Sequence, residues 1–182
     1  CSRGWQTTRS QADRCRRPSS RGTAGISPGR YVAPRLATRF VIVIDASVWL
    51  SAVLPTDAHY QYTVPWKNQI EVSGEPIAVP AHFPAEVAGV LSRTGSDRTF
   101  IAATLDLIVS ERLFTIYPIS AAFGGLCAEI ASVAAVRGSD AIYLALARFL
   151  DVPMLTWDRQ QRERGTVFCR TMTPVEAMEM AE

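Results

Sequence analysis

The sequence predicts a three-layer α/β domain with a mainly parallel central sheet. Short apolar runs, each about the length of one strand, alternate with helical patterns from residue 40 onward. This alternation is typical of strand–helix–strand units, in which successive strands pair in parallel. The runs are uniformly apolar, which indicates a sheet covered by helices on both faces.

Five strands and eight helices are expected in chain order, with no internal repeat. The strands are predicted from the runs FVIVI at 40–44, IAV at 77–79, LFTIY at 113–117, PMLT at 153–156 and TVFC at 166–169. The helices are predicted near 46–53, 58–72, 83–94, 97–110, 121–136, 140–150, 159–164 and 174–181. Prolines punctuate the edges of these segments, where they are tolerated.

The chain divides near residue 39 into a basic leader and an acidic body. Residues 1–39 contain nine arginines and one acid, a formal charge of +8, so residues 40–182 carry −6 of the net +2. The leader is rich in Arg, Ser, Gly and Pro, and such a composition cannot offset its ordering entropy by burial. A nucleic-acid-binding arm and a targeting peptide both fit it, but the abrupt change of composition favours a disordered or non-native extension. We therefore expect one domain over 40–182.

The cysteines and histidines argue against a small domain that is stabilised by zinc or by disulfides. The chain has four scattered cysteines, no C-x-x-C pair and two histidines. This pattern fits neither a zinc site of the usual spacing nor a disulfide framework, and a reducing, cytoplasmic compartment is the default expectation. No apolar run approaches the roughly 18 residues that span a bilayer, so no membrane association is expected.

Four carboxylates are candidates for one shared site. Asp45 directly follows the first apolar run, and Asp158 follows the fourth, within PMLTWD. Asp140 opens the predicted helix SDAIYLALARFL, and Glu86 lies within FPAEVAGVL. In open parallel sheets, ligands bind beyond the carboxyl ends of the strands, where Asp45 and Asp158 are expected.

Each carboxylate also has a possible structural role. The three aspartates stand at predicted helix starts, where capping stabilises a helix by about 0.5–2 kcal/mol. Ser139 could cap the helix of Asp140 in its place. Glu86 shares a helical stripe with apolar residues at i−3, i+1, i+4 and i+5, where a charge is costly unless it is compensated.

If the four carboxylates converge, their repulsion raises some of their pKa values unless a cation lies among them. Ligation by oxygen alone suits Mg²⁺, with Mn²⁺ as an alternative. Such ions clamp scissile phosphates and activate water. The four residues therefore form a candidate metal-dependent phosphodiesterase site.

The segments VIVIDASVWLSAVL, PAHFPAEVAGVLSR and SDAIYLALARFLDVPMLTWD, in this order, resemble PIN-domain ribonucleases, especially VapC-type toxins of bacterial VapBC toxin–antitoxin pairs. The resemblance spans essentially all of 40–182 and implies a PIN-like fold. It implies that the four carboxylates are the catalytic and metal-binding acids. Ser47 and Thr156 match hydroxylated positions that support the metal–water network, although local capping explains both equally well.

The resemblance also implies an activity and partners. These are Mg²⁺-dependent hydrolysis of RNA phosphodiester bonds, a homodimer, and silencing by a cognate VapB-like antitoxin. The acidic body repels RNA until the metal and basic residues such as Arg137, Arg159 or Arg162 offset its charge. The basic leader has no counterpart in the usual family architecture. The alternative is a catalytically silent PIN-like binding or scaffold module.

Overall fold

The computed structural model describes residues 42–110 and 112–180, and these form a five-stranded sheet in the order β3-β2-β1-β4-β5. Every strand pairing is parallel. The strands are β1 (Ile42–Ile44), β2 (Ile77–Pro80), β3 (Phe114–Tyr117), β4 (Met154–Leu155) and β5 (Thr171–Met172). The helices are α1 (Ala46–Val53), α2 (Tyr60–Ser73), α3 (Phe83–Arg93), α4 (Arg98–Val109), α5 (Ala121–Ala134), α6 (Gly138–Leu150), α7 (Arg159–Gly165) and α8 (Pro174–Glu179).

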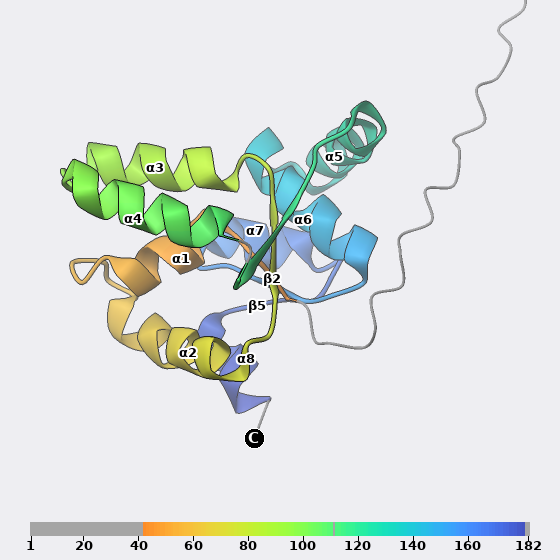
Figure 1. Ribbon diagram of the computed structural model, residues 1–182. Helices are drawn as coiled ribbons and strands as arrows, with labels where there is room; N and C mark the ends of the chain where they lie inside the picture. The colour runs from red at the N-terminus through yellow and green to blue at the C-terminus, as the bar shows by residue number, and fades with distance from the viewer. Residues whose placement is uncertain (1–41, 111, 181–182) are drawn as a thin grey trace, which may run out of the picture. The chain divides into compact units, whose positions relative to one another are not determined.

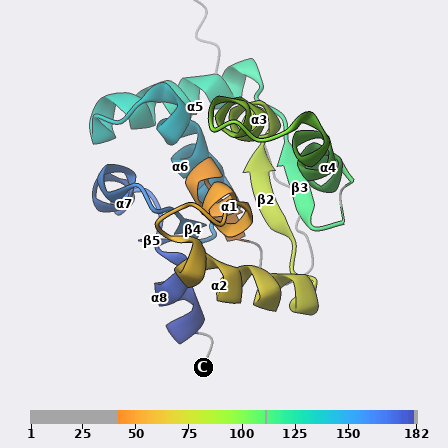
Figure 2. The ribbon, with the colours of Figure 1, turned by 90° about the vertical axis from the view of Figure 1, so that its left-hand side faces the viewer.

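Helices cover both faces of the sheet, so the predicted three-layer α/β fold is confirmed. Helices α1 to α4 lie on one side of the sheet, and α5 with α6 on the other (Figure 1). Figure 2 shows α1 in front of the sheet and α6 behind it. Within the described part of the chain no single helix is long and apolar enough to cross a membrane; only α5 and α6 taken together, bent by 111°, reach that length and composition.

The apolar runs of the sequence form the core because the central strands are buried on both faces. Val43 of β1 lies between Ala78 of β2 and Met154 of β4, and all three side chains are fully buried. Below them the Trp49 indole packs edge-on against the Phe114 ring, with 4.8 Å between the ring centroids. The core therefore anchors the start of α1, which directly follows the central strand.

Strand five was predicted in the wrong place. The apolar run 166–169 forms a turn, in which the backbone N–H groups of Phe168 and Cys169 both donate to the carbonyl of Gly165. The strand begins only at Thr171, where the chain pairs with β4. Residues 1–39, with the leader prediction, lie outside the described residues, as do residues 40–41 of the first predicted strand and 181 of the last predicted helix.

Gly165 closes α7 at a point of close approach to α6 and β5. A Cβ atom added there would clash with Leu144 Cδ2 and lie 3.0 Å from Thr171 Cγ2. We expect Gly165→Ala to lower the free energy of unfolding by about 1–3 kcal/mol, measured by urea denaturation followed by circular dichroism. The control is Gly124→Ala in α5, where the new methyl group meets nothing within 4 Å and should be neutral or stabilising. Equal effects of the two substitutions would contradict this reading of the packing.

Candidate active site

The four predicted acids all stand where a helix begins at the carboxyl-terminal edge of the sheet. Asp45 follows β1 and caps α1, and Asp158 follows β4 and caps α7. Glu86 lies in the first turn of α3, which follows β2, and Asp140 lies in the first turn of α6. Because the strands are parallel, the helices that follow them start at one edge of the sheet, the edge toward which the β2 arrow points in Figure 2.

Asp45 is a buried carboxylate, with 6% of its surface exposed. Its Oδ1 accepts from the Ser47 hydroxyl at 2.6 Å and the Val48 N–H at 3.2 Å, and its Oδ2 accepts from the Thr156 hydroxyl at 2.6 Å. Burial raises the pKa of Asp45 to about 6, the nearby Glu86 charge adds to the rise, and the three hydrogen bonds only partly oppose it. The ionised form of Asp45 therefore lacks a compensating positive charge.

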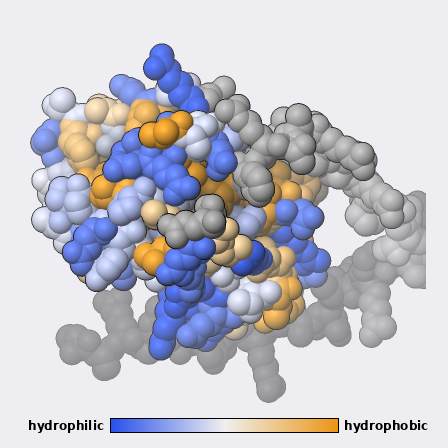
Figure 3. Space-filling model, turned by 90° about the horizontal axis from the view of Figure 1, so that it is seen from below, coloured by the Kyte–Doolittle hydropathy of each residue, from blue (hydrophilic) through white to orange (hydrophobic). Residues whose placement is uncertain are grey.

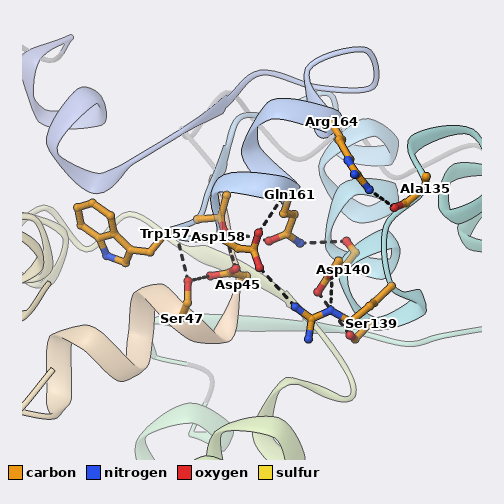
Figure 4. Close-up of polar contacts among 11 residues, drawn as sticks. Asp45, Ser47, Ala135, Ser139, Asp140, Trp157, Asp158, Gln161 and Arg164 are labelled. Carbon is orange, nitrogen blue, oxygen red and sulfur yellow. Dashed lines mark hydrogen bonds and ion pairs between the residues drawn. The ribbon is translucent and has the colours of Figure 1, made fainter. Parts of the chain in front are cut away.

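A hydrogen-bond network joins three of the acids through Thr156 and Gln161 (Figure 4). Two acceptors face the single Thr156 proton, Asp45 Oδ2 at 2.6 Å and Gln161 Oε1 at 2.9 Å. The Gln161 backbone N–H donates to Asp158 Oδ1 at 2.9 Å, and its Nε2 donates to the Asp140 carbonyl at 3.0 Å. Gln161, 1% exposed, thus holds the backbone of one acid and the side chain of another.

Glu86 is held from two sides. The Tyr143 hydroxyl donates to Glu86 Oε2 at 2.5 Å, and His82 Nε2 lies 3.5 Å from the same oxygen. The His82 imidazole and the Tyr143 hydroxyl together lower the pKa of Glu86 against the effect of its partial burial. The hydroxyl remains protonated because burial and the Glu86 charge raise the pKa of Tyr143 far above its usual value. Glu86 is therefore ionised at neutral pH, and the Tyr143 hydroxyl holds its side chain in place.

Arg137 lies between the other two acids. Its Nε is 3.4 Å from Asp140 Oδ2 and its Nη2 is 3.6 Å from Asp158 Oδ2, while 75% of its side chain is exposed. Burial raises the pKa of Asp140, the charges of Asp158 and Glu86 add to the rise, and Arg137 opposes it. The acids are thus electrostatic neighbours, and a cationic side chain already partly neutralises two of them.

No group of three or more His, Cys, Asp or Glu side chains in residues 42–110 and 112–180 is arranged closely enough to hold a metal ion. The donor set is nevertheless the one that hard divalent ions prefer, because it consists of carboxylate and hydroxyl oxygens. The burial of Asp45 without a cationic partner and the position of Arg137 beside two acids both indicate that added positive charge is favourable here. The residues present therefore fit such an ion by their chemistry.

For each aspartate, helix capping was the alternative to a role in the site, and the outcome differs between positions. Asp45 and Asp158 do cap their helices, and this role adds to their place in the network rather than replacing it. Asp140 was expected to open its helix, with Ser139 as the competing cap, and both expectations were wrong. Helix α6 begins at Gly138 with Arg137 as its N-cap, and the Ser139 hydroxyl lies 3.5 Å from Asp140 Oδ1.

Two residues that contact the acids were missed from the sequence. Tyr143 lies three positions after Asp140, and Gln161 three positions after Asp158, which is the spacing of one helical face. That spacing was the available signal, and it was weak because most such pairs on helices carry no function. Arg137 was named only among arginines expected to offset the acidic charge.

A hollow lies at the opposite edge of the sheet, where the strands begin. It has a volume of about 510 Å³ and is lined by residues that precede strands, including Glu75, Pro153 and Arg170, and by side chains of α2 and α8. Figure 3 views the molecule from this side and shows separate apolar patches among hydrophilic ones. None of the four acids lines this hollow, so it is distinct from the candidate active site.

The Tyr143 hydroxyl provides a test of how Glu86 is held. Tyr143→Phe should lower the free energy of unfolding at pH 7 by about 1.5–3 kcal/mol, because a hydrogen bond to a charged group is lost. Because the pKa of Glu86 is lower in the folded than in the unfolded protein, ionised Glu86 stabilises the fold above its unfolded-state pKa, and this stabilisation is lost as pH falls. The difference in free energy of unfolding between wild type and Tyr143→Phe should therefore shrink toward pH 3. Urea denaturation at both pH values measures it. Tyr117→Phe, on the partly exposed edge strand β3, is the control, and an equal loss there would contradict the specific role of the Glu86 contact.

The sequence matches the family model of the PIN domain over residues 42–166. This match covers more than half of the chain and contains all four acids. The chain belongs to the PIN-domain family. No curated protein sequence is significantly similar to it.

Solved structures confirm the fold. VapC20 of Mycobacterium tuberculosis, described as a Sarcin-Ricin loop cleaving toxin, is 19% identical, with a TM-score of 0.57 over 68% of this chain and 95% of that chain. FitAcB from Neisseria gonorrhoeae is 18% identical, with a TM-score of 0.56 over 73% and 97%. VapBC2 from Rickettsia felis, bound to a DNA fragment from its promoter, is 13% identical, with a TM-score of 0.54 over 74% and 98%. At these identities the likeness concerns the fold alone.

Proposed function

We propose that this PIN-domain protein is a metal-dependent endoribonuclease, the VapC-type toxin of a type II toxin–antitoxin pair acting in the cytoplasm. The observation that carries the proposal is Asp45, a buried carboxylate whose pKa is raised to about 6 at the edge of the sheet where three more acids lie. Such a group is costly to ionise at neutral pH unless a cation joins it. A divalent ion provides that charge and is also the usual reagent for phosphodiester hydrolysis.

Each residue of the site would have a distinct role in this reaction. Asp45, Asp140 and Asp158, with Glu86, would hold Mg²⁺ or Mn²⁺, which supplies charge neutralisation at the phosphate and a water of lowered pKa. Ser47 and the threonine hydroxyl at 156 orient Asp45 by hydrogen bonds of 2.6 Å each. Gln161 and Tyr143 position the remaining acids.

Arg137 would exchange partners during this reaction. It contacts two of the acids at 3.4 and 3.6 Å, yet most of its side chain is exposed and free to turn outward. An ion bound to Asp140 and Asp158 would take over its neutralising role. The guanidinium would then be free to pair with an RNA phosphate, a ligand that its planar group binds well.

The likeness to VapC20, FitAcB and VapBC2 supports the proposed partners. The complexes named FitAcB and VapBC2 fit a chain that pairs with a VapB-like antitoxin. The charge of −6 over residues 40–182 favours a basic antitoxin segment, and the acidic pocket is a suitable place for it. We also propose a homodimer, which sedimentation of the full chain would test.

The decisive experiment incubates the full chain with end-labelled single-stranded and structured RNAs, with Mg²⁺, with Mn²⁺ or with chelator. We expect cleavage that chelator stops and that Glu86→Gln and Asp140→Asn each remove. Asp151→Asn is the matched control, because this exposed acid ends α6 with φ 55°, a conformation that Asn adopts readily. Cleavage that persists in chelator, or that Asp151→Asn removes equally, would refute the proposed site.

A catalytically silent module is the second candidate, and the Arg137 contacts favour it. A built-in arginine that permanently pairs with Asp140 and Asp158 would replace a metal rather than precede one. Calorimetric titration with Mg²⁺ and Mn²⁺ separates the two functions. A nuclease should bind the ion and lose that binding in Asp140→Asn, whereas a silent module should bind neither ion and cut no RNA.

A further inference from the structure

Two aromatic rings stack beside the candidate active site. The His59 imidazole and the Trp157 indole lie with 4.2 Å between their centroids and 6° between their planes. Trp157 directly precedes Asp158, and His59 is the residue before α2. The two rings come from segments nearly a hundred positions apart, so the fold alone brings them together.

Hydrogen bonds tie this aromatic pair to the acids. The Trp157 backbone N–H donates to the Ser47 hydroxyl at 3.1 Å, and that hydroxyl donates to Asp45 Oδ1 at 2.6 Å. The indole Nε1–H donates to Thr63 Oγ1 at 2.9 Å, and Thr63 Oγ1 donates to the His59 carbonyl at 2.9 Å. Trp157 is thus held both by its backbone and by its indole, and the His59 carbonyl accepts from the same threonine.

The pair presents an aromatic surface to solvent. His59 is exposed and Trp157 is half-buried, so His59 covers the indole while its own outer side remains open. The His59 side chain makes no capping bond to α2, and the cap position does not require an imidazole. Figure 4 shows the indole of Trp157 pointing away from Asp45, on the side opposite to Asp140. The acids are therefore flanked by a cation, Arg137, on one side and by stacked rings on the other.

We propose that the His59–Trp157 pair is a base-stacking subsite, in which an unpaired nucleobase next to the cleaved phosphodiester stacks on the open face of His59. Unpaired bases bind aromatic side chains in this way with little dependence on their identity. The substrate class is then RNA that is single-stranded or looped at the cut, because a base within a helix has no free face. This inference rests on the proposed nuclease function and adds a base-binding subsite to it.

The test measures binding and cleavage separately. The background is Asp45→Asn, which is expected to slow cleavage about a thousandfold. The full chain is titrated with short labelled RNAs, each with an abasic site at a different position. His59→Ala should weaken binding of intact RNA about tenfold, equivalent to about 1.4 kcal/mol. For the protein that retains His59, an abasic site at one particular position of the RNA should weaken binding by a similar factor. The His59→Ala protein should bind that abasic RNA and intact RNA with equal affinity. His59→Phe should restore binding, because it keeps an aromatic face.

Tyr62→Ala is the matched control, since Tyr62 is an aromatic residue of α2 that is 50% exposed and outside the stacked pair. It should bind every RNA as the background protein does. If each abasic position weakens binding to His59→Ala as much as to the protein with His59, the subsite does not exist. The nuclease proposal is unaffected by that result if wild type still cuts RNA with Mg²⁺.

The reverse outcome is equally distinct. Coupling between His59 and one abasic position, together with no cleavage by wild type in Mg²⁺ or Mn²⁺, would retain the subsite and refute the nuclease. Absence of both RNA binding and cleavage would overturn both proposals. Equal affinity of the protein with His59 for intact RNA and for every abasic RNA would mean that no base stacks on the pair, and it also overturns the subsite.

Discussion

Asp45→Asn is expected to reduce RNA cleavage about a thousandfold while making the metal-free protein more stable. The carboxylate is buried, and its pKa is raised from 3.8 to about 6, so at pH 7 the folded protein holds an unfavourable charge. A shift of that size corresponds to about 3 kcal/mol of lost stability. Asn has the same shape and no charge, so the variant should recover much of this free energy.

The hydrogen bonds around Asp45 also suit an amide. In the wild type, Asp45 Oδ2 and Gln161 Oε1 compete for the single proton of the Thr156 hydroxyl. An Asn Nδ2 at the same place can donate to Thr156, whose proton is then free for Gln161. The other oxygen keeps its bonds from Ser47 and Val48. Replacement therefore leaves no buried polar group without a partner, which would otherwise cost about 1–3 kcal/mol.

The loss of activity has a separate cause. Asp45 is the central acid of the proposed metal site, and removal of one preorganised charge that stabilises a transition state typically costs 10²–10³ in rate, or about 2.7–4 kcal/mol. Cleavage rates in Mg²⁺ and urea denaturation in chelator measure the two effects. Asp151→Asn should change neither quantity. A variant that is less stable than wild type yet still active would contradict both the burial cost and the catalytic role.

The metal-free wild type is expected to lose about 2–3 kcal/mol of stability as pH rises from 4 to 7. The pKa of Asp45 is higher in the folded state, at about 6, than its ordinary value of 3.8. Between these values the folded protein binds more protons than the unfolded chain, so the free energy of unfolding falls with rising pH and stays lower above pH 6. Asp140, whose pKa is also raised, acts in the same direction, and Glu86, whose pKa is lowered, opposes it.

Urea midpoints of the full chain at pH 4, 5, 6 and 7 in chelator measure this loss. The same series for Asp45→Asn should be flatter by about 2–3 kcal/mol, because the titrating group is gone. Added Mg²⁺ should reduce the loss in wild type, since an ion that binds only the folded, ionised site stabilises it by mass action. Parallel pH profiles of wild type and Asp45→Asn would show that Asp45 ionises as it does in water.

The fold could be predicted from local pattern where the pattern was long. Strand β1 and Asp45 are written in consecutive residues, an uninterrupted apolar run and then a carboxylate, and both lie where expected. The position of strand β5 was predicted wrongly because the strand has only two residues and lies at the edge of the sheet. Its place depends on pairing with β4 rather than on its own composition. The start of α6 was predicted two residues too late, because neither Ser139 nor Asp140 caps the helix.

The features of the candidate site also divide into those that local sequence predicts and those that depend on tertiary packing. The amino-acid sequence alone determined that Asp45 and Asp158 follow strands and cap the next helices, because each lies within a few residues of its strand. Only the tertiary structure decided that Tyr143 donates to Glu86, that Arg137 lies between two acids, and that His59 stacks on Trp157. These contacts join residues on different elements, and their geometry is set by how helices pack on the sheet.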